Sequence, residues 1–194
     1  ELKDIIVFQG GTSLSKVHGL IERFSEDIDL TIDRAFLGIS DSDIYENTRK
    51  KRDKLLQDIG SRIASKLDAE VLPLLITKFS ESLNYLGIAK DNWSIQIDPE
   101  DNQNILFYYH KVINNPIDDY IKPIIKLEFR AKGEKEPNFK AYVNSYLAQV
   151  TDSFHTEKIE INTLKPERIF WEKVFILHAQ HTISDKKVLT SRIM

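Results

Sequence analysis

Cysteine is absent from the 194 residues, and methionine occurs once, at Met194. A chain without cysteine has neither disulfides nor thiolate metal sites, which is typical of a reducing compartment, and we expect a cytoplasmic protein. No uninterrupted apolar run is as long as a membrane span, and no segment resembles a signal peptide. We therefore expect no membrane partner.

The chain also has little net charge. Charged residues make up 29% of it, but acidic and basic residues nearly balance and the net charge is −3. No global positive field attracts nucleic acid, so a polynucleotide partner would need a local basic patch. The length and the 41% hydrophobic content suit a chain with one core. We expect a single domain over residues 1–194 with a helical insertion at about 41–86. We also expect both ends to be clipped, because the only methionine is the last residue.

The most informative stretch runs from Phe8 to Leu30 and reads FQGGTSLSKVHGLIERFSEDIDL. The apolar run over 5–8 predicts a buried strand, which the glycine pair interrupts. Apolar residues then recur at helical spacing as far as Ile21, with Thr12 or Ser13 as the predicted N-cap. Strict alternation over 27–32 predicts a second strand. The unit is therefore strand, glycine turn, helix and strand.

Alternation places Asp27 and Asp29 on the same face of the second strand. Two residues along a strand span roughly 6.6 Å. Both carboxylates can therefore reach divalent ions about 3.5–4 Å apart, the spacing of two-metal sites. Without a cation the two charges would repel by up to roughly 2.5 kcal/mol at an effective dielectric near 20. The pair predicts a metal-binding function.

Gly10 and Gly11 precede the predicted helix, where backbone N–H groups and the helix dipole favour a phosphate. Glycine also lets a phosphate come close to the backbone. A phosphate cradle and a carboxylate pair, joined by one short helix, indicate metal-assisted chemistry on a nucleotide.

The string GGTSLSK followed by RFSEDIDL resembles the first motif of the nucleotidyltransferase superfamily that includes DNA polymerase β. It is most similar to the AbiEii/AbiGii family, the nucleotidyltransferase toxins of bacterial type IV toxin–antitoxin and abortive-infection systems. The resemblance implies an α/β fold, with a polymerase β-like core and a mixed, mainly antiparallel sheet flanked by helices. It also implies Mg²⁺-dependent transfer of NMP from an NTP to a hydroxyl acceptor, either a tRNA 3′ end or a protein, and an antitoxin partner.

A second chemical motif lies in IIKLEFR, residues 124–130, which alternates as a strand. Lys126, Glu128 and Arg130 share one face of it. Two-metal phosphoryl transfer generally needs a third carboxylate, and Lys-Leu-Glu resembles the family's second motif, Lys-x-Asp/Glu. By this resemblance Glu128 would bind the catalytic metal and help to deprotonate the attacking hydroxyl.

A third motif, Glu172-Lys173, resembles the Glu-Lys pair of the family, whose lysine points at the triphosphate. Family members usually continue with a basic-His-aromatic-Asp helix. That fourth motif is absent here, because the sequence stops at 191–194.

The complete predicted site has three parts. Asp27, Asp29 and Glu128 would bind two Mg²⁺ ions, or Mn²⁺, and together with Lys173 they form the predicted catalytic group. The nucleotide-binding residues would be Gly10, Gly11, Thr12, Ser13, Lys16, Arg23 and Lys126. Lys16 belongs to this set because it lies one helical turn beyond Thr12 on the same face.

Two alternative functions are consistent with these residues. One is a kinase-like transfer of a phosphoryl group to a protein side chain, with the same cradle and metals. The other is a non-catalytic nucleotide-binding or interaction module. The densest basic cluster, at 49–54, is either a solvated helix face or a grip on the phosphates of an RNA acceptor. His178 and His181 have the spacing of a helical metal pair but no third ligand near them in the sequence, which favours packing or exposure.

The rest of the chain predicts further elements. The segment 44–86 is helical, with Pro73 as a break. Strands are predicted at 93–98, 105–110 and 157–164, and a short helix at 139–150. A helix that opens with Pro166 is predicted to run to about Thr182. Its predicted buried stripe contains Phe170, Val174, Leu177 and Trp171.

Overall fold

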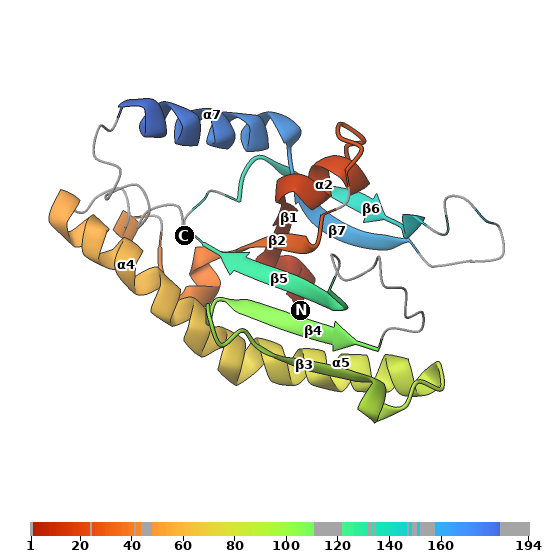
Figure 1. The fold of residues 1–194 in the computed structure, drawn as a ribbon. Coiled ribbons are helices and arrows are strands. Elements are labelled where there is room, and N and C mark those ends of the chain that lie inside the picture. The colour runs from red at the N-terminus through yellow and green to blue at the C-terminus, as the bar shows by residue number, and fades with distance from the viewer. Residues whose placement is uncertain are drawn as a thin grey trace.

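A mixed sheet of seven strands crosses the described part of the protein, in the order β3-β4-β5-β2-β1-β7-β6 (Figure 1). The computed structural model describes residues 2–23, 25–40, 42–43, 48–110, 122–131, 133, 135–146, 148, 151 and 158–182. The strands are β1 (Ile6–Gln9), β2 (Asp27–Ile32), β3 (Trp93–Ile97), β4 (Asn104–Tyr109), β5 (Ile124–Arg130), β6 (Asn138–Val143) and β7 (Ile159–Leu164). The helical elements are α1 (Leu2–Ile5), α2 (Gly10–Lys16), η1 (Arg34–Leu37), α4 (Arg49–Lys66), η2 (Leu67–Val71), α5 (Leu72–Tyr85), η3 (Lys90–Asn92) and α7 (Pro166–Thr182).

Antiparallel pairing dominates this sheet. The pairs β1–β2, β3–β4, β4–β5 and β6–β7 are antiparallel, whereas β2–β5 and β1–β7 are parallel. The predicted α/β fold with a mixed, mainly antiparallel sheet is therefore confirmed. The predicted strand at 27–32 coincides with β2, and the predicted strand at 124–130 coincides with β5.

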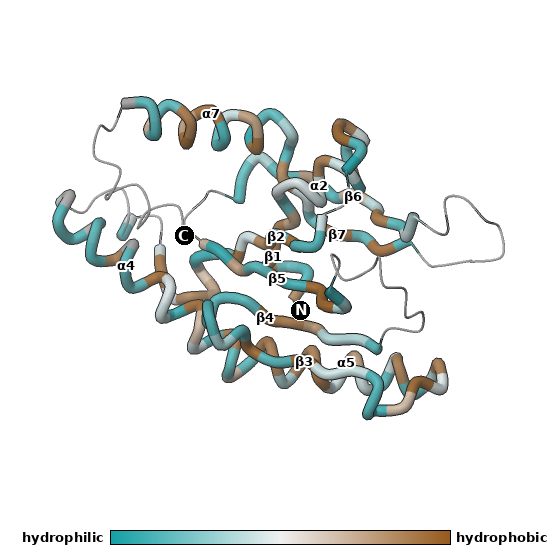
Figure 2. Tube along the Cα trace, viewed as in Figure 1, coloured by the Kyte–Doolittle hydropathy of each residue, from teal (hydrophilic) through white to brown (hydrophobic). Residues whose placement is uncertain are grey.

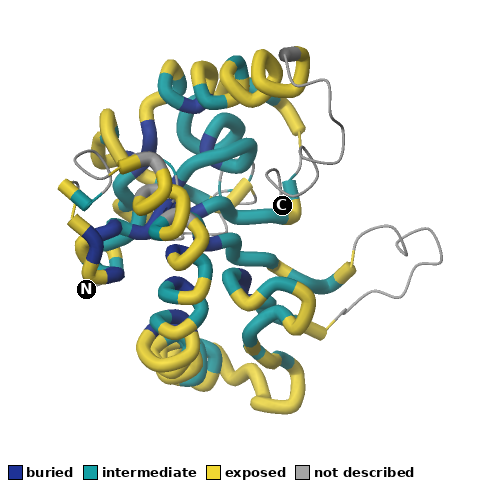
Figure 3. The backbone as a smooth tube through the Cα atoms, turned by 90° about the vertical axis from the view of Figure 1, so that its left-hand side faces the viewer, coloured by how far each residue is buried: buried dark blue, intermediate teal, exposed yellow. Residues whose placement is uncertain are grey.

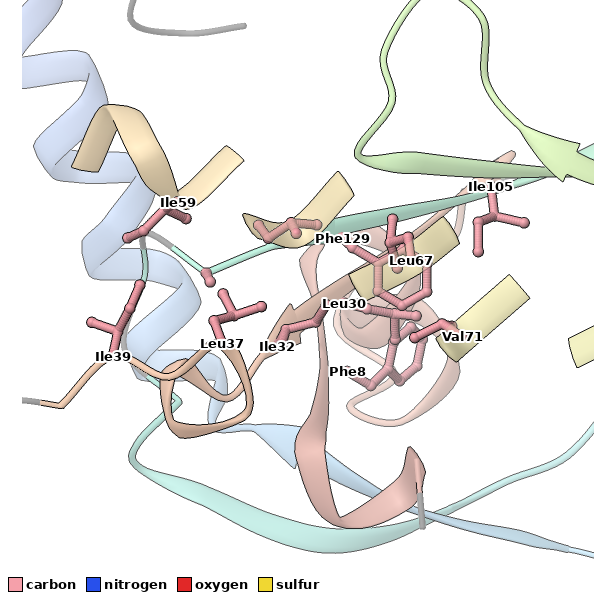
Figure 4. Packing of buried hydrophobic residues seen from close by; sticks show 12 residues of the cluster. Phe8, Leu30, Ile32, Leu37, Ile39, Ile59, Leu67, Val71, Ile105 and Phe129 are labelled. Atoms are coloured by element: carbon pink, nitrogen blue, oxygen red, sulfur yellow. The ribbon is translucent and has the colours of Figure 1, made fainter. Parts of the chain in front are cut away.

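Helices cover the two faces of the sheet differently. On one face, Ile59 and Ile63 of α4 and Leu67 and Val71 of η2 pack on strand residues such as Phe129 (Figure 4). On the other face, a smaller cluster joins Val7 and Leu164 of the sheet to Leu14 of α2 and Ile169 of α7. Figure 1 shows the same division, with α4 and α5 on one side of the strands and α2 and α7 on the other. The side chains of Ile28, Leu30 and Ile32 belong to the first face, so Asp27 and Asp29 project from the second.

The predicted break near Pro73 takes the form of one π-helical turn. α4 continues into η2 and then into α5, which begins at Leu72. Pro73 is the second residue of α5, and its missing backbone N–H removes one donor from the continuous helical run just where the π-helical turn ends. Residues 44–47 of the predicted helical segment lie outside the described residues.

Three predictions about the extent or burial of helices were wrong in whole or in part. The segment predicted as a short helix at 139–150 begins as strand β6, because Ala141 is buried opposite Ile161 of β7 and this pairing overrides the local spacing. Beyond β6, the described residues 146 and 148 are helical, so the later part of this prediction agrees with the structure and only its start was wrong. The helix after the glycine turn ends at Lys16, well before Ile21, and Gly19 then adopts a positive φ of 61°.

The third wrong prediction concerns the face that α7 buries. Phe170, Trp171 and Leu177 are exposed, at 60%, 55% and 64%, and Val174 is half-buried. The buried residue is instead Ile169, in the first turn. Figure 3 shows α7 exposed along most of its length, and Figure 2 shows hydrophobic positions distributed along it. In the described part of the chain, α7 is thus anchored at its start.

No helix among the described residues is long and apolar enough to span a bilayer.

The packing of α4 predicts a large stability effect at Ile63, which is fully buried. Ile63→Ala should lower the free energy of unfolding by about 3 kcal/mol, because it removes buried methylenes and leaves a cavity. Ile176→Ala, at a position 42% exposed on α7, should cost less than about 1 kcal/mol. Urea denaturation of both variants measures the difference, and equal losses would contradict the described core.

Candidate active site

Three carboxylates converge on the face of the sheet that α2 and α7 share. β2 and β5 are parallel neighbours, with Asp27 in register with Lys126 and Asp29 in register with Glu128. Side chains in register on adjacent strands project from the same face. Glu128 therefore lies beside the Asp27–Asp29 pair, as the alternation of both segments predicts.

The glycine turn lies directly against one of these acids. Gly10 has a φ of 73°, and a Cβ atom placed on it would lie 1.8 Å from Oδ2 of Asp29. β1 and β2 pair in such a way that Gln9, the residue before Gly10, is opposite Asp29. Only glycine suits this position, both for its backbone conformation and for the space that the carboxylate occupies. The turn and the acid are therefore one packed unit.

The neighbouring residues of the turn have separate roles. A Cβ on Gly11 would lie 2.5 Å from an Nη atom of Arg23, so the guanidinium lies beside the turn. The Thr12 hydroxyl donates a hydrogen bond of 2.5 Å to the backbone carbonyl of Asp27, and the Ser13 hydroxyl donates one of 2.9 Å to that of Gly10. The prediction that Thr12 or Ser13 is the N-cap was wrong. Gln9 occupies the N-cap position, and both hydroxyls hold the turn in place.

Lys126 lies between two of the carboxylates. Its Nζ atom is 2.5 Å from Oε1 of Glu128 and 3.4 Å from Oδ1 of Asp27. Burial by itself would lower the pKa of Lys126, but the hydrogen bond and charge of Glu128, with a smaller effect of Asp27, raise it instead. The ammonium therefore stays protonated and neutralises part of the acidic group.

Arg130 is a site residue that the predicted set does not contain. Its guanidinium lies 3.5 Å from Oε2 of Glu128 and 3.1 Å from Oδ2 of Asp101, and it donates a hydrogen bond of 2.9 Å to Oδ1 of Asn104. The alternation of β5 indicates that Arg130 shares a face with Glu128. Its contact with Asp101 depends on the β3–β4 turn, whose position the local sequence pattern does not reveal.

The surroundings of Asp29 raise the pKa of its carboxyl group. Burial raises its pKa, the neighbouring Glu128 raises it further, and Asp27 adds to the effect. Lys173 on α7 and Arg130 act in the opposite direction. Lys173 itself is exposed, so α7 brings a solvent-accessible cation close enough to influence Asp29.

Lys16, a predicted nucleotide-binding residue, contacts an aromatic ring from a distant part of the chain. Its ammonium lies 3.0 Å from the ring centroid of Tyr146, in a cation–π contact. Burial lowers the pKa of this lysine, and Tyr146 partly opposes the shift. The sequence pattern does not reveal this contact, because it joins two residues that lie far apart in the sequence.

The donor set fits a hard divalent cation, since it consists of carboxylate oxygens on one face. Burial and, after it, the charge of Glu128 raise the pKa of Asp29, and a bound cation would relieve the repulsion between these carboxylates. The described residues nevertheless contain no group of three His, Cys, Asp or Glu side chains already arranged around a metal position. The carboxylates therefore fit metal binding in chemistry, with Lys126 between two of them.

Two other predicted features lie elsewhere. Lys50 and Lys51 of the basic cluster are exposed on α4, the helix that packs on the opposite face of the sheet from the carboxylates. His181 is exposed near the end of α7, and no metal cluster within the described ranges includes it.

The contact between Gly10 and Asp29 predicts a specific effect of substitution. Gly10→Ala should lower the free energy of unfolding by about 1–2 kcal/mol for the left-handed backbone and by about another 1–3 kcal/mol for the clash. Gly87→Ala is the matched control, because Gly87 has the same φ of 73° but nothing within 4 Å of its Cβ position. Chemical denaturation of the two variants isolates the clash. Similar losses would show that Asp29 does not pack on Gly10.

The raised pKa of Asp29 predicts a pH-dependent gain in stability on its neutralisation. A carboxyl whose folded pKa exceeds its unfolded value opposes folding above that pKa. In EDTA, Asp29→Asn should therefore raise the free energy of unfolding at neutral pH. The gain should shrink as the pH falls through the raised pKa and disappear below 3.8, the ordinary pKa of an aspartate. The exposed control Asp68→Asn should change little, and a pH-independent effect of Asp29→Asn would contradict the electrostatic explanation.

Comparisons with known proteins identify a family for this chain. The chain has no match among curated proteins. Among solved structures, MenT4, a nucleotidyltransferase toxin from Mycobacterium tuberculosis H37Rv, matches 89% of this chain with 13% sequence identity and a TM-score of 0.43. The match covers 44% of that protein, so the chain spans less than half of its length. Residues 1–188 match the family described as "Nucleotidyl transferase AbiEii toxin, Type IV TA system". The chain therefore belongs to the AbiEii family of nucleotidyltransferase toxins.

Proposed function

We propose that the protein transfers a nucleoside monophosphate from an NTP to a hydroxyl acceptor, with release of pyrophosphate. The observation that carries this proposal is the register of β2 and β5, which places Glu128 beside Asp27 and Asp29 and next to the glycine turn. The kind of reaction is that of its family, whereas the donor, the acceptor and the metal are our proposals.

Asp27, Asp29 and Glu128 would hold two Mg²⁺ ions, or Mn²⁺. When bound, these ions would supply positive charge to the α-phosphate and to the leaving oxygen. The chain itself fixes the positions of the acids, because Asp29 is packed on Gly10 and because the Thr12 hydroxyl anchors the backbone at Asp27.

The donor's β- and γ-phosphates would lie at the turn formed by Gly10, Gly11, Thr12 and Ser13. The first backbone N–H groups of a helix have no partner within it and can donate to phosphate oxygens. Arg23 lies beside Gly11 and would add a positive charge there, while Lys173 would approach from α7. Lys16 is a weaker candidate for the same role because it contacts Tyr146.

In the proposed reaction, the acceptor oxygen bonds to the α-phosphorus, and the bond from that phosphorus to the α,β-bridging oxygen breaks. The electron pair of the broken bond leaves with pyrophosphate. The hydroxyl proton passes to Glu128, a carboxylate on the same face as the aspartates. The acceptor is a tRNA 3′ end or another protein. The enzyme itself acts in the cytoplasm under the control of an antitoxin.

Removal of one carboxylate provides the test. Asp27→Asn should reduce Mg²⁺-dependent transfer by at least about 100-fold, because it removes several kcal/mol of charge stabilisation. The assay uses each α-³²P-labelled NTP with total tRNA or with cell protein as acceptor, and Asp68→Asn as the control. Unchanged transfer by a folded Asp27→Asn protein would reject the assignment.

The position of the label separates the alternatives. Label from the α-phosphate on the acceptor indicates nucleotidyl transfer, whereas label from the γ-phosphate alone indicates a kinase-like activity. Binding of an NTP without transfer of either label indicates a non-catalytic nucleotide-binding module.

A further inference from the structure

Lys126 occupies the space that two of the acids share. Its ammonium lies within 3.4 Å of an oxygen of Asp27 and 2.5 Å of an oxygen of Glu128. These two acids come from adjacent strands, so the lysine joins β2 to β5 across the site. An ammonium at this place is a monovalent cation that is part of the protein.

The same acids are the ones that the proposed function assigns to a divalent cation. Two cations cannot occupy the same space between two carboxylates, so the ammonium and the metal exclude one another there. Arg130 holds the other oxygen of Glu128, at 3.5 Å, which further limits the freedom of this acid.

The side chain of Lys126 is exposed enough to move away from the two acids. Its side chain is 32% exposed, and the side chain of Asp27 is 45% exposed. A lysine carries its charge on a flexible four-carbon stem and makes no rigid bidentate contact, so its ammonium can move without a change of the backbone. The glycine turn, where the donor's phosphates would lie, is packed on Asp29 in the same strand as Asp27.

We propose that Lys126 is an internal counter-ion that competes with the divalent cation for Asp27 and Glu128, and that the triphosphate of the donor relieves this competition by accepting the displaced ammonium. This proposal rests on the proposed function and concerns its regulation. The metal binds weakly to the protein without nucleotide, and metal and nucleotide strengthen the binding of one another. Such coupling is reciprocal, so each ligand raises the affinity of the other by the same factor.

The test measures Mn²⁺ binding without any turnover. Free Mn²⁺ is quantified by its electron paramagnetic resonance signal during titration of the folded chain, in the absence of nucleotide. Lys126→Met should bind Mn²⁺ at least about tenfold more tightly than the original protein, because the competing charge is gone. Lys126→Arg retains a cation and should bind Mn²⁺ as weakly as the original protein does.

Two controls distinguish the possible outcomes. Lys140→Met removes a lysine of the edge strand β6, away from the central strands β2 and β5, whose Nζ is 2.9 Å from Glu160 of β7, and it should leave Mn²⁺ affinity unchanged. Asp27→Asn should abolish the tight binding in the Lys126→Met background. An Mn²⁺ affinity that depends on Asp27 but is the same with lysine or methionine at position 126 would overturn the competition and leave the metal site intact. Absence of any Asp27-dependent Mn²⁺ binding would overturn both the competition and the metal site of the proposed function.

The second arm of the test measures coupling. A non-hydrolysable NTP analogue should increase the Mn²⁺ affinity of the original protein more than that of Lys126→Met. Equal increases in the two proteins would show that the ammonium is not transferred to the phosphates, and would overturn that part of the proposal.

Discussion

The mutual repulsion of three carboxylates is the constraint on which this site depends. β2 and β5 could place their acids far apart only by a slip of register, and a slip of one residue would bury the acids among apolar side chains on the α4 face. The apolar residues that alternate with the acids therefore fix the register, and the register in turn forces like charges together. The result is a site that is destabilised unless a cation is present. Lys126 and Arg130 supply that cation within the chain.

The glycine turn packs directly on one of the repelling carboxylates and so links these charges to the backbone. Asp29 fills the space that a Cβ on residue 10 would need, so the strand that bears the acids and the turn that precedes α2 cannot move independently. The Thr12 hydroxyl makes a second link, from α2 to the backbone of β2. A ligand that binds at the turn would therefore influence the acids through packed atoms as well as through charge.

Much of this arrangement follows from the sequence because it depends on local periodicity. The period of two in DIDLTI and in IIKLEFR was sufficient to predict both strands and the face on which Asp27, Asp29 and Glu128 lie. The pairing of β2 with β5 is a tertiary fact, and it is not visible in either segment alone. That Glu128 would lie near the two aspartates was expected from the resemblance to the family.

The wrong predictions also depend on tertiary contacts. The spacing of apolar residues at 139–150 fits a helix, but β7 offers Ala141 a strand partner. The stripe of α7 fits a buried face, but Phe170 and Trp171 contact each other at the surface, and Ile169 is the α7 residue that joins the buried cluster with the sheet. Likewise, the cation–π contact of Lys16 joins α2 to a residue 130 positions later, at Tyr146. Each of these depends on which surface another part of the chain presents, which local patterns do not encode.

The π-helical turn between α4 and α5 has a consequence for how the chain can change during evolution. The buried residues Ile59, Ile63, Leu67 and Val71 follow one another at intervals of four, and in a regular α-helix this spacing drifts by about 40° at each step. The wider turn at Leu67–Val71 absorbs part of that drift and keeps the series facing the sheet. The loss of one residue there would turn all of α5 by about 100° about its axis. In this helix pair, length is therefore constrained more tightly than composition, and substitutions are tolerated where deletions are not.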